Sequence, residues 1–156
     1  MSPSTALGTG FELHPRLAAD TFVLGDFPLC RLLLMNDAQY PWFILVPRRD
    51  GAREIYLLDE ADQQQLLRES VHLSRALMEA FRGDKLNVAA LGNVVPQLHV
   101  HHIVRYKSDA AWPAPAFGGD PPPPYTPAAR EQRVAALRKS MLSESIDFRW
   151  ADFNRL

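Results

Sequence analysis

Three of the chain's five histidines lie within four consecutive positions, in the segment QLHVHHIV at 97–104. Apolar residues separate and follow them, and this pattern predicts a β-strand. Alternate side chains of a strand point to the same face, so Gln97, His99 and His101 share one face. His102 points to the opposite face, where its neighbours are apolar and where we expect the core. The alternation therefore predicts a polar site at His99 and His101 and a packing role for His102.

A pair of imidazoles on one face points to chemistry rather than to packing. Burying both rings costs desolvation, and the two rings repel each other when both are protonated. Near pH 7 a neutral imidazole is a good nucleophile that can form a covalent phosphorus–nitrogen bond. A second imidazole beside it can neutralise charge on the phosphate or protonate the leaving group. The pair therefore predicts a reaction at a phosphate.

Metal binding is the alternative use of the pair. Two histidines supply two ligands, and a third and a fourth must come from elsewhere in the chain. The remaining strong candidates are His14, His72 and Cys30. His72 is expected on the solvent side of a helix and His14 in a weakly structured N-terminal stretch, and no carboxylate lies at a metal-ligand spacing. We therefore expect no metal site.

The composition is typical of a globular domain. The 156 residues are 47% hydrophobic and 22% charged, and the formal net charge is −1. A charge near zero argues against binding of duplex nucleic acid but leaves room for a small phosphorylated ligand. The single cysteine excludes an internal disulfide. No signal peptide is evident and no apolar run approaches the roughly 20 residues of a membrane helix, so we expect a soluble cytoplasmic protein without membrane partners.

The predicted elements form an α+β pattern. Leucines and other apolar residues at three- and four-residue spacing predict a long helix over about 59–82. Glu69 and His72 are expected on its exposed face, and its buried face is expected to contain Leu66, Leu67, Val71, Leu77, Met78 and Phe81. Gly83 is expected to end this helix. Strands come before and after the helix, and their short reversals favour antiparallel pairing. The predicted strands are 21–25, 30–35, 42–47, a short one at 53–58, 85–91 and 97–106, and a second helix is predicted at 127–142.

Between 111 and 128 the chain contains seven prolines and the aromatic residues Trp112 and Phe117. Proline lacks an amide donor, so this segment is neither a central strand nor a helix. It is either an ordered arm that covers the domain or an extended linker, and the two aromatics favour some packing. The aromatic tail at 148–156 is expected to dock on the domain or on a partner subunit.

The segment QLHVHHI at 97–103 resembles the signature of the histidine triad (HIT) family, His-φ-His-φ-His-φ-φ, where φ is apolar. Gln97 replaces the first histidine, and His102 occupies an apolar position. The preceding GNVVP, the following Val104 and Arg105, and the order of the upstream strands also resemble this family, over roughly 22–107. The chain looks like a bacterial branch in which Gln-Leu-His-φ-His runs into a proline-rich segment that contains a tryptophan.

The resemblance implies a role for each matching residue. His99 would be the nucleophile that attacks the α-phosphate of a nucleotide and forms a nucleotidyl-histidine, which water then hydrolyses. His101 would contact the phosphate and help to position the reacting groups. Asn36 would bind the ribose, Asn93 would lie near the phosphates, and Leu33 would wall the base pocket. Without the resemblance, Asn36 followed by aspartate would be interpreted as a turn. Arg105 shares the face of His99 and is expected either to meet a phosphate or to lie exposed at an edge.

The resemblance also implies the architecture. We expect a HIT-like antiparallel sheet with one long helix and a C-terminal helix, usually paired into a homodimer, with no metal or other cofactor. Residues 1–110 would form the nucleotide-binding domain, and residues 111–156 would form a proline-rich arm and a helix that pack on the same domain.

The predicted function is that of a HIT-type nucleotide hydrolase or nucleotidyl transferase. Its substrate would be a dinucleoside polyphosphate or a nucleoside phosphoramidate. We place Gln97 in the catalytic set with His99 and His101, although its amide cannot exchange a proton near neutral pH. Many family members have a histidine where this chain has Trp42, so we expect one support of the catalytic strand to be missing. The alternative is a nucleotide-binding module with little or no turnover.

Overall fold

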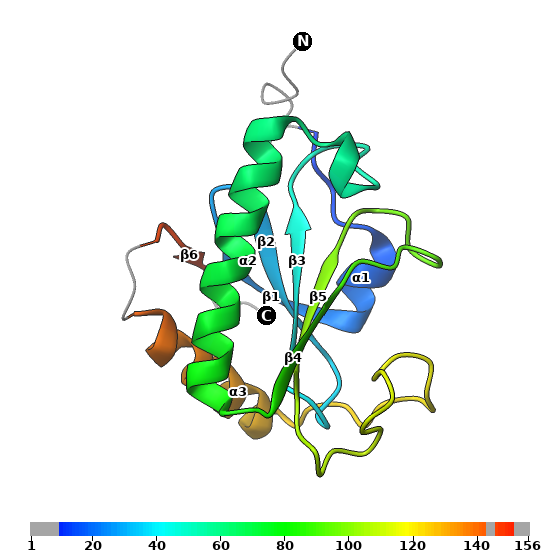
Figure 1. The fold of residues 1–156 in the computed structure, drawn as a ribbon, viewed down its shortest axis with the longest axis vertical. Coiled ribbons are helices and arrows are strands. Elements are labelled where there is room, and N and C mark those ends of the chain that lie inside the picture. Colours follow the sequence, from blue (N-terminus) through cyan, green and yellow to red (C-terminus); the bar gives the residue numbers. More distant parts are fainter. Residues whose placement is uncertain (1–9, 143–145, 152–156) are drawn as a thin grey trace.

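The computed structural model describes residues 10–142 and 146–151, which form one β-sheet with helices packed on it (Figure 1). The strands pair antiparallel throughout, in the order β4-β5-β3-β2-β1-β6. The α+β prediction is therefore confirmed. The strands are β1 (Thr21–Asp26), β2 (Cys30–Met35), β3 (Trp42–Pro47), β4 (Lys85–Ala89), β5 (Val100–Arg105) and β6 (Arg149–Trp150). The helices are α1 (Pro15–Asp20), α2 (Glu60–Phe81) and α3 (Pro127–Met141), with one 3₁₀ turn, η2 (Ile55–Leu57).

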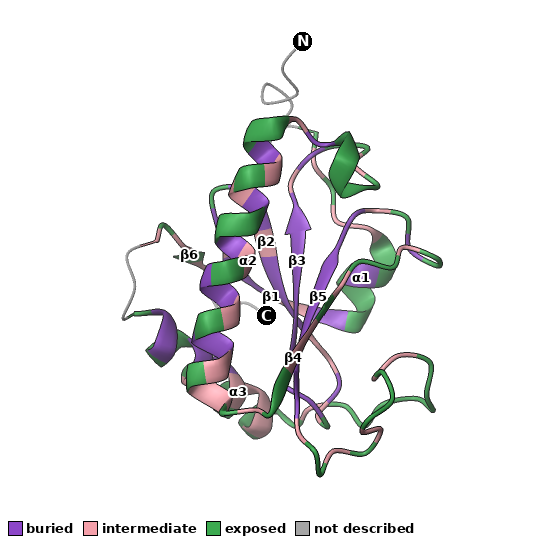
Figure 2. Ribbon diagram, viewed as in Figure 1, coloured by how far each residue is buried: buried purple, intermediate pink, exposed green. Residues whose placement is uncertain are grey.

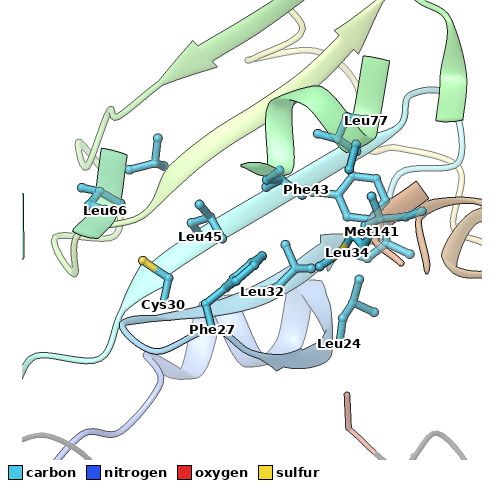
Figure 3. Close-up of a cluster of buried hydrophobic side chains, with 14 of the residues drawn as sticks. Leu24, Phe27, Cys30, Leu32, Leu34, Phe43, Leu45, Leu66, Leu77 and Met141 are labelled. Carbon is cyan, nitrogen blue, oxygen red and sulfur yellow. The ribbon is translucent and has the colours of Figure 1, made fainter. Parts of the chain in front are cut away.

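The sheet separates two apolar clusters. Alternate residues of β5 lie on opposite faces, so Val100 and Val104 join the cluster under α2 and α3, while Ile103 joins the cluster on the α1 side. Figure 2 shows that the central strands are buried, whereas β4, at the edge, contains only exposed and partly buried residues. Figure 3 shows leucines and phenylalanines of the first cluster meeting side chains of α2 and α3. The predicted alternation of the histidine segment is confirmed.

The buried face of helix α2 is only partly the one that we predicted, since Leu66 and Leu77 are buried as expected but other positions are not. Leu67 and Val71 are 64% and 39% exposed, whereas Glu69 and His72 are buried. The Glu69 carboxylate accepts the backbone N–H groups of Leu29 (2.9 Å) and Cys30 (2.7 Å), so its charge is satisfied at the start of β2. A buried carboxylate with backbone donors cannot be recognised from apolar spacing alone, because its partners lie about 40 residues away in the sequence.

Two neighbouring residues at the C-terminus of α2 have different roles. Arg82 adopts a left-handed conformation with φ of 48°, which terminates α2. Gly83, which we expected to provide this stop, instead allows close packing, because a Cβ atom there would overlap Val104 and approach the backbone oxygen of Arg105 to 3.0 Å. The C-terminus of α2 is therefore pressed against the strand that carries the histidines.

Two other boundaries differ from the prediction. Strand β5 begins at Val100 rather than at 97, because the Leu98 N–H bonds to the Ala52 oxygen of the loop after β3 instead of to a neighbouring strand (2.9 Å). The predicted strand at 53–58 is the 3₁₀ turn η2. In the tail, Phe148 and Trp150 pack on the first cluster, and residues 152–156 lie outside the described part of the chain. No described helix is long and apolar enough to cross a membrane.

We predict that Gly83→Ala destabilises the fold by roughly 1–3 kcal/mol, because the added methyl overpacks the contact with β5. Gly119→Ala is the matched control, since a Cβ at that position meets nothing within 4 Å. Denaturant unfolding of both variants measures the difference. Equal stabilities for the two would contradict the close approach.

Candidate active site

His99 and His101 form one compact pair on the α1 side of the sheet. Their ring centroids are 4.9 Å apart and the rings meet edge to face. The side chains are only 7% and 5% exposed. His101 lies opposite Ile44 of β3, while His99 lies in the connection just before β5. The structure thus brings together the two residues in which the sequence predicted chemistry.

The hydrogen bond of His99 determines which of its nitrogens is free. Its Nδ1 lies 2.7 Å from the backbone oxygen of Gln97. A carbonyl oxygen only accepts, so Nδ1 carries the proton and donates. The lone pair of the neutral ring is therefore on Nε2, which is the atom that can act as a nucleophile.

The hydrogen bond of His101 selects the opposite tautomer. The indole Nε1–H of Trp42 donates to Nδ1 of His101 over 3.0 Å. Indole nitrogen is only a donor, so Nδ1 of His101 is unprotonated and Nε2 carries the proton. Burial, followed by the neighbouring His99 and His102, lowers the pKa of His101 to about 3. The ring is therefore neutral near pH 7 and offers an N–H at Nε2 beside a histidine that offers a lone pair.

Trp42 supports the histidine pair, contrary to our expectation that it would leave a support missing. Its ring also packs edge to face on His101, with centroids 5.7 Å apart. A tryptophan in place of a histidine thus supplies both a donor and an apolar wall. The sequence could not reveal this, because the bond joins residues 59 positions apart.

His102 takes no part in this pair, as predicted. It is fully buried on the other face, where Ser70 Oγ donates to its Nε2 over 2.7 Å and its Nδ1 donates to the Val100 oxygen over 3.0 Å. Burial lowers the pKa of His102 to about 4, although the bond to Val100 opposes the shift. His102 therefore fastens β5 to helix α2.

The side chain of Gln97 binds backbone rather than facing open space. Its Oε1 accepts the N–H of His14 over 2.8 Å, and its Nε2 donates to the oxygen of Glu12 over 2.9 Å. Its backbone oxygen holds His99. Gln97 thus connects the N-terminal segment to the start of the histidine strand.

Arg105 is neither a phosphate ligand nor an exposed edge residue, the two alternatives suggested by the sequence. It is 1% exposed and binds both carboxylate oxygens of Asp109, at 2.8 and 2.9 Å. It also donates to Asn87 Oδ1 and to the backbone oxygen of Ala114, each over 2.9 Å. A buried charge with this many partners is a structural anchor, and it holds the start of the proline-rich segment on the sheet.

The proline-rich segment brings an aromatic ring to the site that the sequence had not assigned to it. Phe117 packs edge to face on His101 and on Trp42, with centroids 4.9 and 5.5 Å apart. Its position between prolines and the pair Gly118-Gly119 is the only sequence signal that could have drawn attention to it. Trp112, by contrast, lies over the guanidinium of Arg105.

A cleft of about 830 Å³ lies between α1, the turn after β2 and the proline-rich segment, and neither His99 nor His101 is among its lining residues. Trp42 and Phe117 line it, and both also touch His101. Asn36 lines it too, and its Oδ1 accepts the N–H of Tyr125 over 2.8 Å. Polar lining residues are Arg16, Asp20, Asp37, Gln39 and Asp120.

The other two predicted ligand residues lie away from this cleft wall. Leu33 is fully buried in the cluster on the α1 side of the sheet. Asn93 is exposed in the connection between β4 and β5. In the part of the chain that the structure describes, no group of three or more histidine, cysteine or acidic side chains could hold a metal ion.

Comparisons with known proteins place this geometry in context. A family model described as the HIT domain matches residues 16–108. A histidine triad protein of Marinobacter aquaeolei VT8 is 57% identical, with 85% of this chain and 97% of that chain covered and a TM-score of 0.82. The protein blr8122 of Bradyrhizobium japonicum is 50% identical (84% and 98% covered, TM-score 0.82), and SMc02904 of Sinorhizobium meliloti 1021 is 37% identical (85% and 98%, TM-score 0.83). A search of curated proteins gave no match.

We predict that Trp42→Phe frees the His101 ring to exchange tautomers and lowers the free energy of unfolding by about 1–3 kcal/mol, because a buried acceptor loses its donor. Imidazole ¹⁵N chemical shifts report the tautomer, and denaturant unfolding reports the stability. Trp112→Phe makes the same chemical change on a ring that does not touch His101. If His101 kept a single tautomer in Trp42→Phe, the indole bond would not be what selects it.

Proposed function

We propose, because this chain belongs to the histidine triad family, that it is a nucleotide hydrolase or nucleotidyl transferase that acts through a covalent nucleotidyl-histidine. Membership of the family supports a nucleotide-binding, hydrolase or transferase role. The covalent step is our proposal, and one observation carries it: neighbouring histidines hold opposite tautomers, one presenting a lone pair and the other an N–H.

In the first step the Nε2 lone pair of His99 attacks the α-phosphorus. The Nε2–P bond forms as the bond from phosphorus to the leaving group breaks, and the leaving group takes that electron pair and a proton from water. The Nδ1–H of His99 keeps its hydrogen bond to the backbone oxygen of Gln97, and this bond stabilises the positive charge that develops on the ring. The Nε2–H of His101 donates to a non-bridging phosphate oxygen.

In the second step water attacks phosphorus and the P–N bond breaks. His99 recovers its lone pair, the proton of the water passes to solvent, and a nucleoside monophosphate is released. A nucleotidyl transferase would use an acceptor hydroxyl or amine in place of water. Gln97 would position His99 through its backbone oxygen and would not transfer protons, because an amide does not titrate near neutral pH.

The cleft is the proposed place for the nucleoside. Asn36 Oδ1 is engaged by Tyr125, so its amide nitrogen is the group that would meet a ribose hydroxyl. Leu33 would support the base pocket indirectly, because it packs against residues that line the cleft. Asn93, exposed before β5, would lie near the phosphates. The proposed substrates are dinucleoside polyphosphates and nucleoside phosphoramidates, and the proposed catalytic reaction needs no metal.

We predict that the purified protein, with a chelator present, releases AMP from adenosine phosphoramidate or a diadenosine polyphosphate. His99→Ala should reduce this release by roughly three orders of magnitude or more, because it removes the nucleophile. Thermal melting and nucleotide binding of the variant verify that it is folded. Nucleotide binding without any release by the wild-type protein would favour a binding module, the alternative that the replacement of the first histidine by Gln97 supports.

We also propose that the protein forms a homodimer. Strand β4 ends the sheet, and an edge strand offers unpaired backbone groups for pairing with another chain. Val88 of this strand is 49% exposed, and the exposed side of α2 adds Leu67 and Val71. Apolar side chains beside an open edge are a surface that a second copy could cover.

Light scattering should give twice the chain mass of 17.6 kDa. We predict that Leu67→Glu weakens self-association by about tenfold or more, because it places a charge in an apolar contact. The matched control is Leu142→Glu at the end of α3, where the leucine is 77% exposed. A monomeric wild-type protein, or equal effects of the two changes, would contradict this interface.

A further inference from the structure

The proline-rich segment 110–126, called the arm here, crosses the histidine face of the sheet and is fastened at both ends. At its start Arg105 binds Asp109 and the Ala114 oxygen. At its end the Pro123 oxygen accepts the Ala38 N–H over 2.9 Å, and the Tyr125 N–H bonds to Asn36. The path of the arm is therefore fixed by contacts to β5 on one side and to the turn after β2 on the other.

Phe117 lies between these two fastenings and closes one side of the His101 ring. Trp42 covers a second side and His99 a third, at centroid distances of 5.7 and 4.9 Å. Gly118 follows Phe117 with φ of +79°, a backbone conformation that a larger residue rarely adopts. The turn that directs Phe117 onto the histidine is therefore encoded in the arm itself.

Phe117 also lines the 830 Å³ cleft together with Trp42 and Tyr40. One ring thus faces both the reacting histidine and the space proposed for the nucleoside. Aromatic rings are sequence-tolerant stacking partners for bases, and each such contact is worth about 1–3 kcal/mol.

We infer that Phe117 is a positioning and specificity-determining residue: it holds the His101 ring against Trp42 and forms the wall on which a nucleobase packs in the cleft. The first part stands on the contacts of the side chains alone. The second part rests on the proposed nucleotide chemistry. Among the described residues of the arm, Phe117 is the one whose ring both packs on His101 and lines the cleft.

The surroundings of His101 make its titration a direct readout of this role. The charged or titratable groups near it are His99 and His102 of its own segment, while Trp42 of β3 and Phe117 of the arm are uncharged. Beyond Phe117 the cleft carries Arg16 and Asp20 of α1, Asp37 of the turn after β2, and Asp120 of the arm. Burial is the main cause that keeps the His101 pKa low, so loss of the Phe117 ring should admit water and raise that pKa.

The test compares Phe117→Ala, Phe117→Leu and the control Trp112→Leu, which removes an aromatic ring of the same arm that lies over Arg105. Imidazole NMR between pH 8 and 4.5 should show no titration of His101 in the wild type. In Phe117→Ala the midpoint should rise from about 3 by about two units or more and so enter this range. Phe117→Leu, which keeps apolar cover, and the Trp112 control should resemble the wild type.

The kinetic experiment follows release of the nucleoside monophosphate and gives KM and kcat for the substrate. Both Phe117 variants should raise KM about tenfold, because both remove the stacking ring, and only Phe117→Ala should also lower kcat. A folded Phe117→Ala with unchanged His101 titration overturns the positioning role, and an unchanged KM in Phe117→Leu overturns the specificity role. If Phe117→Ala does not fold, Phe117→Val takes its place in the titration, because valine is smaller than leucine and covers less of the His101 ring. An unchanged His101 midpoint in Phe117→Val then overturns the positioning role, and an unchanged KM in Phe117→Leu still overturns the specificity role.

The titration needs no substrate, so the two proposals fail separately. A raised His101 midpoint in a protein that hydrolyses nothing supports the positioning role and removes the proposed hydrolase. Nucleotide dissociation constants then take the place of KM, and a constant that is unchanged in Phe117→Leu overturns the stacking wall.

Discussion

The site depends on one hydrogen bond, from the indole of Trp42 to Nδ1 of His101. An indole can only donate, so this bond leaves His101 one neutral tautomer and directs its remaining N–H away from β3. Because β3 and β5 are neighbours in the sheet, the bond is as rigid as the pairing of the two strands. The helices on the other face keep that pairing in place, and His102 and Ser70 connect β5 to α2 directly.

Two buried charges hold the surrounding structure. Glu69 of α2 accepts the backbone N–H groups at the start of β2, and Arg105 of β5 binds Asp109, Asn87 and Ala114. In each case the cost of burying the charge is offset by several directed hydrogen bonds. The fold therefore places these two charges where segments distant in sequence meet, whereas His101 lies among the uncharged rings of Trp42 and Phe117.

The sequence predicts local alternation well and long-range partners poorly. The two faces of the histidine strand, the antiparallel α+β sheet and the C-terminal helix all follow from periodicity and turn residues. The buried face of α2 was predicted correctly at Leu66 and Leu77 but not at Glu69 and His72, because these two residues are polar. Only the distant backbone of β2 explains the burial of Glu69. Trp42 and Arg105 were misjudged for the same reason, since their contacts belong to the tertiary structure. The sequence could not decide whether the arm is an ordered cover of the domain or an extended linker. Prolines exclude regular helices and central strands, but they do not indicate which residues a segment packs on.

The fixed ends of the arm have a consequence for how this scaffold could diversify. Its tip, from Gly119 to Pro122, is exposed, while the fastenings at Asp109 and Tyr125 lie on the sheet. Insertions or exchanges within the tip would change the shape of the cleft without displacing β3 or β5. Such a loop could vary in sequence or length and thereby change which molecule enters the cleft, while the contacts around His101 stay the same.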